Sequence, residues 1–324
     1  MNRFVEMLRE MFEKSETERI KEFDLSYIQR DDMIRYDNLK YGPDAAWNTL
    51  DLYRPRDGSD KKMPVIISVH GGGWIYGSKE GYQYYCMTLA EKGYAVINFN
   101  YRLAPKFHFP APMEDLNTLM HWLFTNAQTY QLDLEQLYAV GDSAGAHILG
   151  AYAAICTNES YASNFSFEIP AQNCFKAIAL NSGVYYSNAK KKKTDFVRIL
   201  VYEYLDLNQR DSGGDMCGED LEKMEKTIDL FEYVNYVTER YPDTFVMTAA
   251  DDFVKEQSAR FAMELVKKSV NSELRMYVSR EHRLEHVFHC DLRLHEAETC
   301  NQDEIEFFRK YEFKNKGESV GEHV

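Results

Sequence analysis

Two runs of apolar residues near the start of the chain, 64–70 and 94–101, contain few polar positions. Strands that are buried on both faces have this pattern, because helices cover both sides of a parallel sheet. Three more segments of the same kind follow at 136–140, 175–182 and 243–250. Together they predict a mostly parallel sheet at the centre of the fold.

Segments with apolar residues at helical spacing alternate with these strands. Such alternation is typical of an α/β fold, in which helices cover both faces of the sheet. Residues 31–42 and 47–55 instead alternate apolar and polar side chains, and they predict an antiparallel strand pair at the sheet's edge. A last strand is expected at 274–279. The expected helices are 82–93, which ends at Gly93, and 112–130, 144–157, 255–269 and 302–313.

The first 20 residues carry charges throughout and lack the apolar stretch of a signal peptide, so we expect no secretion signal. Their apolar residues recur at helical spacing and predict an amphipathic helix. These residues are Phe4, Val5, Leu8, Met11 and Phe12.

Residues 184–240 break the alternation of strands and helices and are interpreted as a partly helical insertion. The lysine run at 190–193 is expected in a solvated surface turn rather than in a binding patch. The most apolar stretch, 137–156, is interrupted by Asp142, Ser143 and His147. It therefore predicts a buried strand and helix rather than a membrane span.

The chain of 324 residues has 38 basic and 52 acidic side chains, a formal net charge of −14. This charge disfavours nucleic acids and anionic membranes as partners. None of the six cysteines shows C-x-x-C spacing, which excludes the usual zinc-ribbon and thioredoxin patterns. We expect reduced thiols, a cytoplasmic location and no stable membrane insertion; self-association is left open.

One apolar strand runs directly into a helix through Gly141-Asp142-Ser143-Ala144-Gly145. Gly-x-Ser-x-Gly at such a joint is the pattern of a nucleophile elbow, a sharp turn that exposes a serine hydroxyl. The alternative is a tight turn in which Ser143 only caps the helix. The pattern by itself leaves both interpretations open.

A serine nucleophile needs backbone donors for an oxyanion, and "HGGGW" at 70–74 follows a buried strand. Consecutive glycines let backbone N–H groups approach a ligand closely, which favours an oxyanion hole over a flexible turn. A phosphate loop is excluded, because the pattern G-x-x-x-x-G-K-[ST] is absent. His70 is expected to be a structural hydrogen-bonding residue.

A catalytic serine also needs a base and an acid that orients the base. Asp251 and Asp252 end a predicted strand, where parallel sheets place their sites, and one of them could cap the next helix. His282, His286 and His289 follow the last strand. Their i, i+4, i+7 spacing fits either a general base in a loop or, with less support, a metal-binding helix face.

These motifs together resemble the bacterial hormone-sensitive-lipase-like esterases of the α/β-hydrolase superfamily. The resemblance covers about residues 35–315. It implies the α/β-hydrolase fold, with a mostly parallel central sheet, helices on both faces and a helical cap, and it implies no metal or organic cofactor. It rests on "HGGGW", "NYRLAPKFHFPAPMEDL", "GDSAG", a "TA-x-x-D" segment and "HVFH", which occur in the family's order.

Carried over motif by motif, the resemblance implies Ser143 as the nucleophile and His286 as the base. It places the acid at Asp252, with Asp251 as the less favoured candidate. The implied oxyanion donors are the backbone N–H groups of Gly71, Gly72 and Ala144.

Two positions depart from the family pattern, since Val287 stands where glycine is frequent and Phe253 where proline is frequent. Neither departure removes a reacting group. The family also covers its active site with a cap, and residues 1–35 and 184–240 resemble the cap pieces in position. The catalytic domain would then comprise 36–183 and 241–324.

The resemblance implies a serine carboxylic-ester hydrolase that acts on small molecules with short, acetyl-type acyl groups through an acyl-enzyme. The alternatives are an amidase or formamidase on the same machinery, and a non-catalytic small-molecule receptor on a hydrolase scaffold. Four aromatic residues could line the substrate pocket or serve as ordinary packing: Trp74, Tyr76, Tyr185 and Tyr186.

Overall fold

The computed structural model describes residues 3–24, 31–57, 61–171, 175–207 and 218–312. Within these ranges eight strands form one sheet in the order β1-β2-β4-β3-β5-β6-β7-β8. β1 and β2 are antiparallel, as are β2 and β4, and all other neighbours are parallel. The strands are β1 (Met33–Lys40), β2 (Thr49–Pro55), β3 (Met63–Val69), β4 (Ala95–Phe99), β5 (Leu132–Asp142), β6 (Ala177–Asn181), β7 (Asp243–Ala249) and β8 (Ser272–Tyr277).

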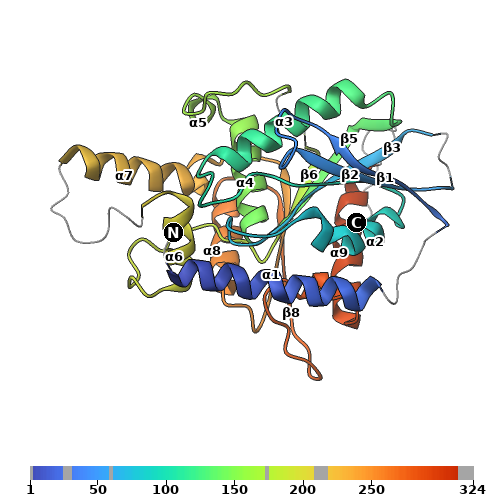
Figure 1. The fold of residues 1–324 in the computed structure, drawn as a ribbon. Helices are drawn as coiled ribbons and strands as arrows, with labels where there is room; N and C mark the ends of the chain where they lie inside the picture. The colour runs from blue at the N-terminus through green and yellow to red at the C-terminus, as the bar shows by residue number, and fades with distance from the viewer. Residues whose placement is uncertain (1–2, 25–30, 58–60, 172–174, 208–217, 313–324) are drawn as a thin grey trace, which may run out of the picture.

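Helices cover both faces of this sheet (Figure 1). One face packs against α2 and α9, and the other packs against α3, α4 and α8. This α/β architecture is the one that the sequence predicts. The α-helices are α1 (Arg3–Asp24), α2 (Lys79–Ala90), α3 (Ala111–Asn126), α4 (Ala144–Thr157), α5 (Glu159–Ala162), α6 (Phe196–Tyr204), α7 (Gly218–Phe231), α8 (Lys255–Lys267) and α9 (His295–Glu312); two short 3-10 helices are η1 (Tyr233–Tyr236) and η2 (Phe288–Cys290).

The side chains of β3 show why its sequence is almost continuously apolar. Val65, Ile67 and Val69 belong to the core between the sheet and α3 and α4, whereas Ile66 belongs to the core beside α2 and α9. All four side chains are fully buried. Since successive residues of a strand point to opposite faces, a strand between two helical layers needs apolar residues at every position.

The last helix begins earlier than the sequence predicts, at His295 rather than at residue 302. Ala297, Cys300, Asn301 and Glu304 are buried at helical spacing. Because two of these four side chains are polar, the hydrophobic pattern does not reveal the first turns. Asn301 is held inside by the hydrogen bond that its Nδ2 donates to the carbonyl of His289, at 3.1 Å.

The helix α1 packs against α2 and α6, so the two segments expected to form a cap meet along one side of the molecule (Figure 1). Phe12 of α1 stacks on Tyr76, with 4.6 Å between ring centroids. The lysines at 190–193 lie in exposed turns, as expected. Residues 1–2, 25–30 and 208–217 of the expected cap pieces lie outside the described residues, and the division into catalytic domain and cap stays a prediction. Among the described helices, none has the length and apolarity to cross a bilayer.

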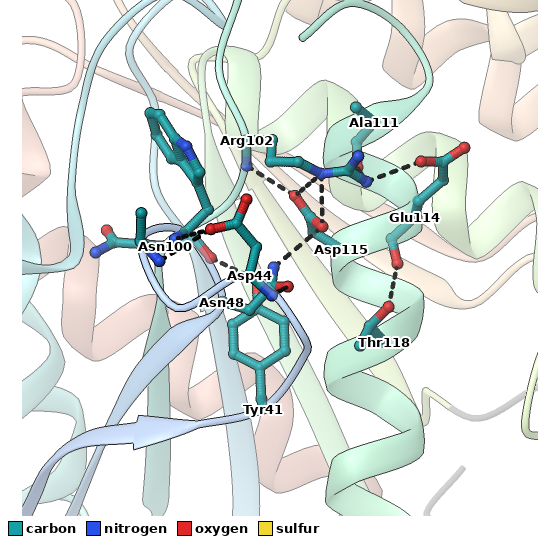
Figure 2. A network of polar contacts seen from close by, with 11 residues as sticks. Tyr41, Asp44, Asn48, Asn100, Arg102, Ala111, Glu114, Asp115 and Thr118 are labelled. Carbon is teal, nitrogen blue, oxygen red and sulfur yellow. Dashed lines mark hydrogen bonds and ion pairs between the residues drawn. The ribbon is translucent and has the colours of Figure 1, made fainter. Parts of the chain in front are cut away.

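A network of charged and polar side chains fixes the loop that follows β4 (Figure 2). Asp115 of α3 accepts hydrogen bonds from the backbone N–H and Nε of Arg102, at 2.7 and 2.9 Å, and from Nδ2 of Asn48, at 3.1 Å. Burial raises the pKa of the Asp115 carboxyl more than these donors lower it. Further along the anchored loop, Ala104 N–H donates to the carbonyl of Trp74 at 2.9 Å. The network therefore supports the glycine turn at 70–74.

Candidate active site

Ser143 occupies the sharp turn between β5 and α4, with φ 53° and ψ −117°. A positive φ is strained for a residue with a Cβ and persists only where the surroundings enforce it. The helix α4 passes so close to β3 that a Cβ on Gly145 would lie 2.0 Å from the carbonyl oxygen of Val69. The hydroxyl of Ser143 makes no helix-capping hydrogen bond. The geometry is that of an elbow and not of a helix cap.

The side chain of His286 links Ser143 to Asp252. Its Nε2 lies 2.9 Å from Oγ of Ser143, and its Nδ1 lies 2.8 Å from Oδ1 of Asp252. With the proton on Nδ1, His286 donates to the carboxylate and accepts from the serine hydroxyl. Val287, the next residue, has a left-handed backbone with φ 56°. This conformation favours glycine, which is the residue that the family pattern has at this position.

Asp252 is held rigidly behind the histidine. Its side chain is fully buried, and it also accepts hydrogen bonds from Val254 N–H at 3.0 Å and from Thr248 Oγ1 at 3.2 Å. Burial by itself would raise the pKa of this carboxyl, but the hydrogen bond from His286, its charge and the Val254 N–H hold the pKa below its usual value. Asp252 is therefore ionised at neutral pH.

Asp251, the other candidate acid, lies near Arg283. Its side chain is 40% exposed, and its Oδ1 lies 3.9 Å from Nε of Arg283. The structure brings Asp252 rather than Asp251 to His286. Asp252 also accepts from the backbone N–H of Val254 just before α8, but the helix itself begins without a side-chain cap, so neither aspartate has the capping role.

The glycine turn presents three backbone N–H groups with different surroundings. Gly71 N–H donates to the hydroxyl of Tyr82 at 3.1 Å, so the oxyanion role expected for Gly71 does not fit this geometry. Gly72 and Gly73 have φ of 124° and 58° and line the cavity beside Ser143. Their N–H groups, and that of Ala144, have no hydrogen-bond partner among the residues that the structure describes.

His70 has the structural role that the sequence indicates. It is completely buried, its Nδ1 donates to the carbonyl of Gly71 at 2.7 Å, and its ring stacks on Tyr101 with 4.1 Å between centroids. Burial lowers the pKa of His70 to about 4. The ring is neutral at physiological pH and supports the glycine turn through its hydrogen bond to Gly71.

The three histidines of the last loop do not converge on a common point. His286 faces Ser143, His282 is exposed, and His289 is buried with its Nε2 3.5 Å from Sγ of Cys290. Residues 278–287 form no helix, so the i, i+4, i+7 spacing does not place the rings on one face. Over the described ranges, the group of three potential metal-ligand side chains whose ligand atoms lie within 4.8 Å of one another is Asp142, His289 and Cys290.

A cavity of about 460 Å³ opens beside Ser143 and His286. Trp74 and Tyr76 line it, while Tyr185 stacks on Phe261 and Tyr186 lies under the guanidinium of Arg260. Several other lining residues belong to no motif, although those of α1 and α6 lie in the segments 1–35 and 184–240 that were expected to form a cap. These are Phe12 and Ser15 of α1, Tyr82 of α2, and Phe196, Val197 and Leu200 of α6.

Comparisons with known proteins show the family and the fold of this chain. A family model described as BD-FAE matches residues 50–265, about two thirds of the chain. Arylacetamide deacetylase from Bos taurus is 36% identical over 117 residues, which cover 34% of this chain, and ethyl acetate hydrolase from Pseudomonas putida is 36% identical over 110 residues, which cover 33%. The chain spans about a third of the length of these two relatives, 29% and 33%.

Solved structures resemble the whole fold. Esterase B from Lactobacillus rhamnosis superimposes with a TM-score of 0.78 over 95% of this chain and 96% of that protein. The two sequences are 23% identical, so the similarity shows a common fold.

Proposed function

The chain belongs to the BD-FAE family and, like the hormone-sensitive-lipase-like esterases, to the α/β-hydrolase superfamily; from this premise we propose that it is a serine carboxylesterase. The proposed reaction is hydrolysis of a carboxylic ester through an acyl-enzyme formed on Ser143. The observation that carries the proposal is the continuous contact from Ser143 through His286 to Asp252.

In the proposed mechanism, Oγ of Ser143 attacks the ester carbonyl while Nε2 of His286 takes the hydroxyl proton. Asp252 holds the histidine in the correct tautomer and stabilises the imidazolium that forms. The tetrahedral intermediate collapses, the ester C–O bond breaks, and His286 gives its proton to the leaving alcohol. Water then attacks the acyl-enzyme, His286 again moves the proton, and the carboxylic acid leaves.

The negative charge that develops on the carbonyl oxygen needs donors that do not have to reorganise. We propose the N–H groups of Gly72 and Ala144 for this role, with Gly73 in place of Gly71. Gly73 lines the cavity beside Ser143, whereas the N–H of Gly71 is already bonded to Tyr82.

The proposed substrates are neutral esters of small molecules with short, acetyl-type acyl groups. The cavity volume of about 460 Å³ lies in the lower half of the range of about 300–1,000 Å³ that is usual for small-molecule sites. Carboxyl groups of Asp142 and Glu285 lie at the cavity, and the chain has a net charge of −14. Both features disfavour an anionic substrate. Ethyl acetate hydrolase, a relative by sequence, is named for an acetyl ester.

A second candidate is hydrolysis of an amide by the same residues. The relative from Bos taurus is named for deacetylation of arylacetamides. An amide requires protonation of a poorer leaving group by His286, so the two activities share every residue and differ in rate. A receptor without catalysis is disfavoured, because Ser143, His286 and Asp252 are in mutual contact.

The test uses purified full-length protein with p-nitrophenyl acetate, butyrate and octanoate, and with the matched p-nitroacetanilide. We expect turnover of the acetate and butyrate esters, slower turnover of the octanoate, and little cleavage of the anilide. Ser143→Ala should abolish turnover, and a fluorophosphonate should label Ser143 in the wild-type protein only. Wild-type protein that is inert toward all four substrates would contradict the proposal.

The last loop supplies a matched control for the base. His286→Asn should abolish ester hydrolysis, whereas His282→Asn should keep wild-type turnover, because His282 is exposed and does not face Ser143. Equal losses in the two variants would point to a general effect on the loop and against the proposed base.

A further inference from the structure

The two halves of the candidate site come from different loops that must stay in register. The glycine turn follows β3 and the elbow follows β5, and these parallel neighbours have Val69 opposite Gly141 as their last paired residues. Beyond this pair, hydrogen bonds between β3 and β5 no longer hold the two loops together. The oxyanion donors of one loop and the hydroxyl of the other must nevertheless be held at a fixed separation, since misplacement by about 1 Å can cost 10²-fold in rate.

The hydroxyl of Tyr82 connects these two loops. It accepts a hydrogen bond from the N–H of Gly71 at 3.1 Å and donates one to Oδ2 of Asp142 at 2.7 Å. Gly71 directly precedes Gly72, and Asp142 directly precedes Ser143. Tyr82 is 7% exposed and lines the cavity. A phenol has one proton to donate and lone pairs to accept, so a single oxygen can make both bonds.

The contact is tight on both sides. A Cβ on Gly71 would lie 2.5 Å from Oδ2 of Asp142 and 3.1 Å from the hydroxyl of Tyr82, so these three groups fill the space between the loops. The bond to the carboxylate is charge-assisted and buried, which makes it stronger than a neutral hydrogen bond at the surface.

We propose that Tyr82 is a positioning residue for the hydrolysis reaction: its hydroxyl ties the glycine turn to the nucleophile elbow and thereby sets the distance between the oxyanion donors and Oγ of Ser143. Tyr82 does not touch the reacting atoms. It acts through Gly71 and Asp142 on their neighbours in the chain. This inference rests on the proposed ester hydrolysis.

The central variant is Tyr82→Phe, which removes one oxygen and keeps the ring that packs beside His70. A misplaced oxyanion hole weakens binding of the transition state and not of the ester, so kcat and kcat/KM should fall together while KM stays the same. We expect kcat for p-nitrophenyl acetate to fall about 10- to 100-fold. A residue that only stabilises the fold would lower the melting temperature and leave kcat of the folded enzyme unchanged.

Tyr94→Phe is the matched control. Tyr94 is also buried and donates its hydroxyl hydrogen to the carboxylate of Glu312, but it directly precedes β4, at the opposite end of the strands from the site. It should lose stability and keep wild-type kcat and KM.

A double-mutant cycle with Asp142→Asn separates positioning from independent effects. Tyr82→Phe removes the hydrogen bond between Tyr82 and Asp142, and Asp142→Asn weakens it by replacing the charged acceptor with a neutral amide oxygen. Because both changes act on the same bond, the double variant should lose no more in kcat than the more impaired single variant. Should Tyr82→Phe fail to fold, Asp142→Asn tests the same link from the other side, with a fall in kcat at constant KM expected.

The possible results are distinct. Active wild-type enzyme with an unimpaired Tyr82→Phe, or with losses that multiply in the double variant, overturns the role of Tyr82 and leaves the proposed function standing. Wild-type protein that is inert toward esters and toward the fluorophosphonate overturns the proposed function and the role of Tyr82 with it.

Discussion

Two aspartates that are adjacent in the chain have opposite environments in this protein. Asp252 is fully buried against His286, and Asp251 is 40% exposed near Arg283. Burial raises the pKa of a carboxyl, and hydrogen bonds to its charged form lower it. At Asp252 the hydrogen bonds and the charge of His286 prevail and the pKa is lowered. The charge that the proposed mechanism needs is thus maintained by the residues that hold the carboxylate.

The pair offers a matched test of the acid. Asp252→Asn should lower kcat for p-nitrophenyl acetate by about 10⁴-fold, since an amide no longer favours the correct tautomer of His286. Asp251→Asn should stay within twofold of wild type. The measurement is steady-state kinetics at pH 7.5 on variants with checked folding. A severe loss of kcat in Asp251→Asn together with wild-type kcat in Asp252→Asn would show that the acid is Asp251 and not Asp252.

At the scale of the elements, the glycine turn after β3 depends on the residue type at position 72. Gly72 has φ 124°, and a Cβ there would lie 2.0 Å from the backbone oxygen of Tyr76. Rotation of a side chain cannot relieve that overlap, so the backbone itself would have to move. The same backbone carries the N–H groups of the proposed oxyanion hole, so the shape of the turn and its chemistry cannot be separated.

Gly72→Ala should therefore lower kcat for p-nitrophenyl acetate at least about 100-fold, by displacing the N–H groups of the turn. Gly93→Ala is the control, because Gly93 also has a positive φ, 101°, but a Cβ there meets nothing within 4 Å. It should cost about 1–2 kcal/mol in the free energy of unfolding and leave kcat unchanged. Urea unfolding and kinetics on both variants measure the two effects. Wild-type kcat in Gly72→Ala would contradict the proposed donor.

At the scale of the whole molecule, a buried carboxyl ties the last helix to the centre of the sheet. Glu304 of α9 accepts hydrogen bonds from Tyr85 at 3.0 Å and from Asn181 at 2.6 Å, and the carbonyl of Asn181 in turn accepts the N–H of Ser143 at 2.9 Å. Burial, with the charge of Asp142, raises the pKa of Glu304 to about 7, although the two hydrogen bonds oppose this.

This raised pKa makes stability depend on pH. Between about pH 4.5 and 7 the unfolded chain has released the proton of Glu304 while the folded protein still holds it, so raising the pH favours unfolding. The wild type should lose on the order of 2 kcal/mol relative to Glu304→Gln between pH 5 and pH 8. Urea unfolding at both pH values measures the difference. Glu306→Gln, on the exposed side of α9, controls for the loss of a charge; the prediction is wrong if Glu304→Gln follows the wild type at both pH values.

Local sequence determined the strands and most helices, because each needs only neighbours at a fixed period: continuous apolar residues for β3 and helical spacing for α8. The Gly-x-Ser-x-Gly pattern at Ser143 was visible in the sequence, but it left an elbow and a helix cap open until the backbone of Ser143 and its missing capping bond were seen. The start of α9 was not visible, because Asn301 and Glu304 are buried through partners elsewhere in the fold.

Only the tertiary structure decided which side chains meet. Spacing left three histidines and two aspartates open; the family resemblance favoured His286 and Asp252, and the fold brings them together with Ser143, which is 143 residues from His286 along the chain. The link through Tyr82 had no signal in the sequence, because a tyrosine on a helix reveals nothing of the loops it reaches. Periodicity records which face of an element is buried, whereas hydrogen bonds between elements depend on the packing of the whole chain.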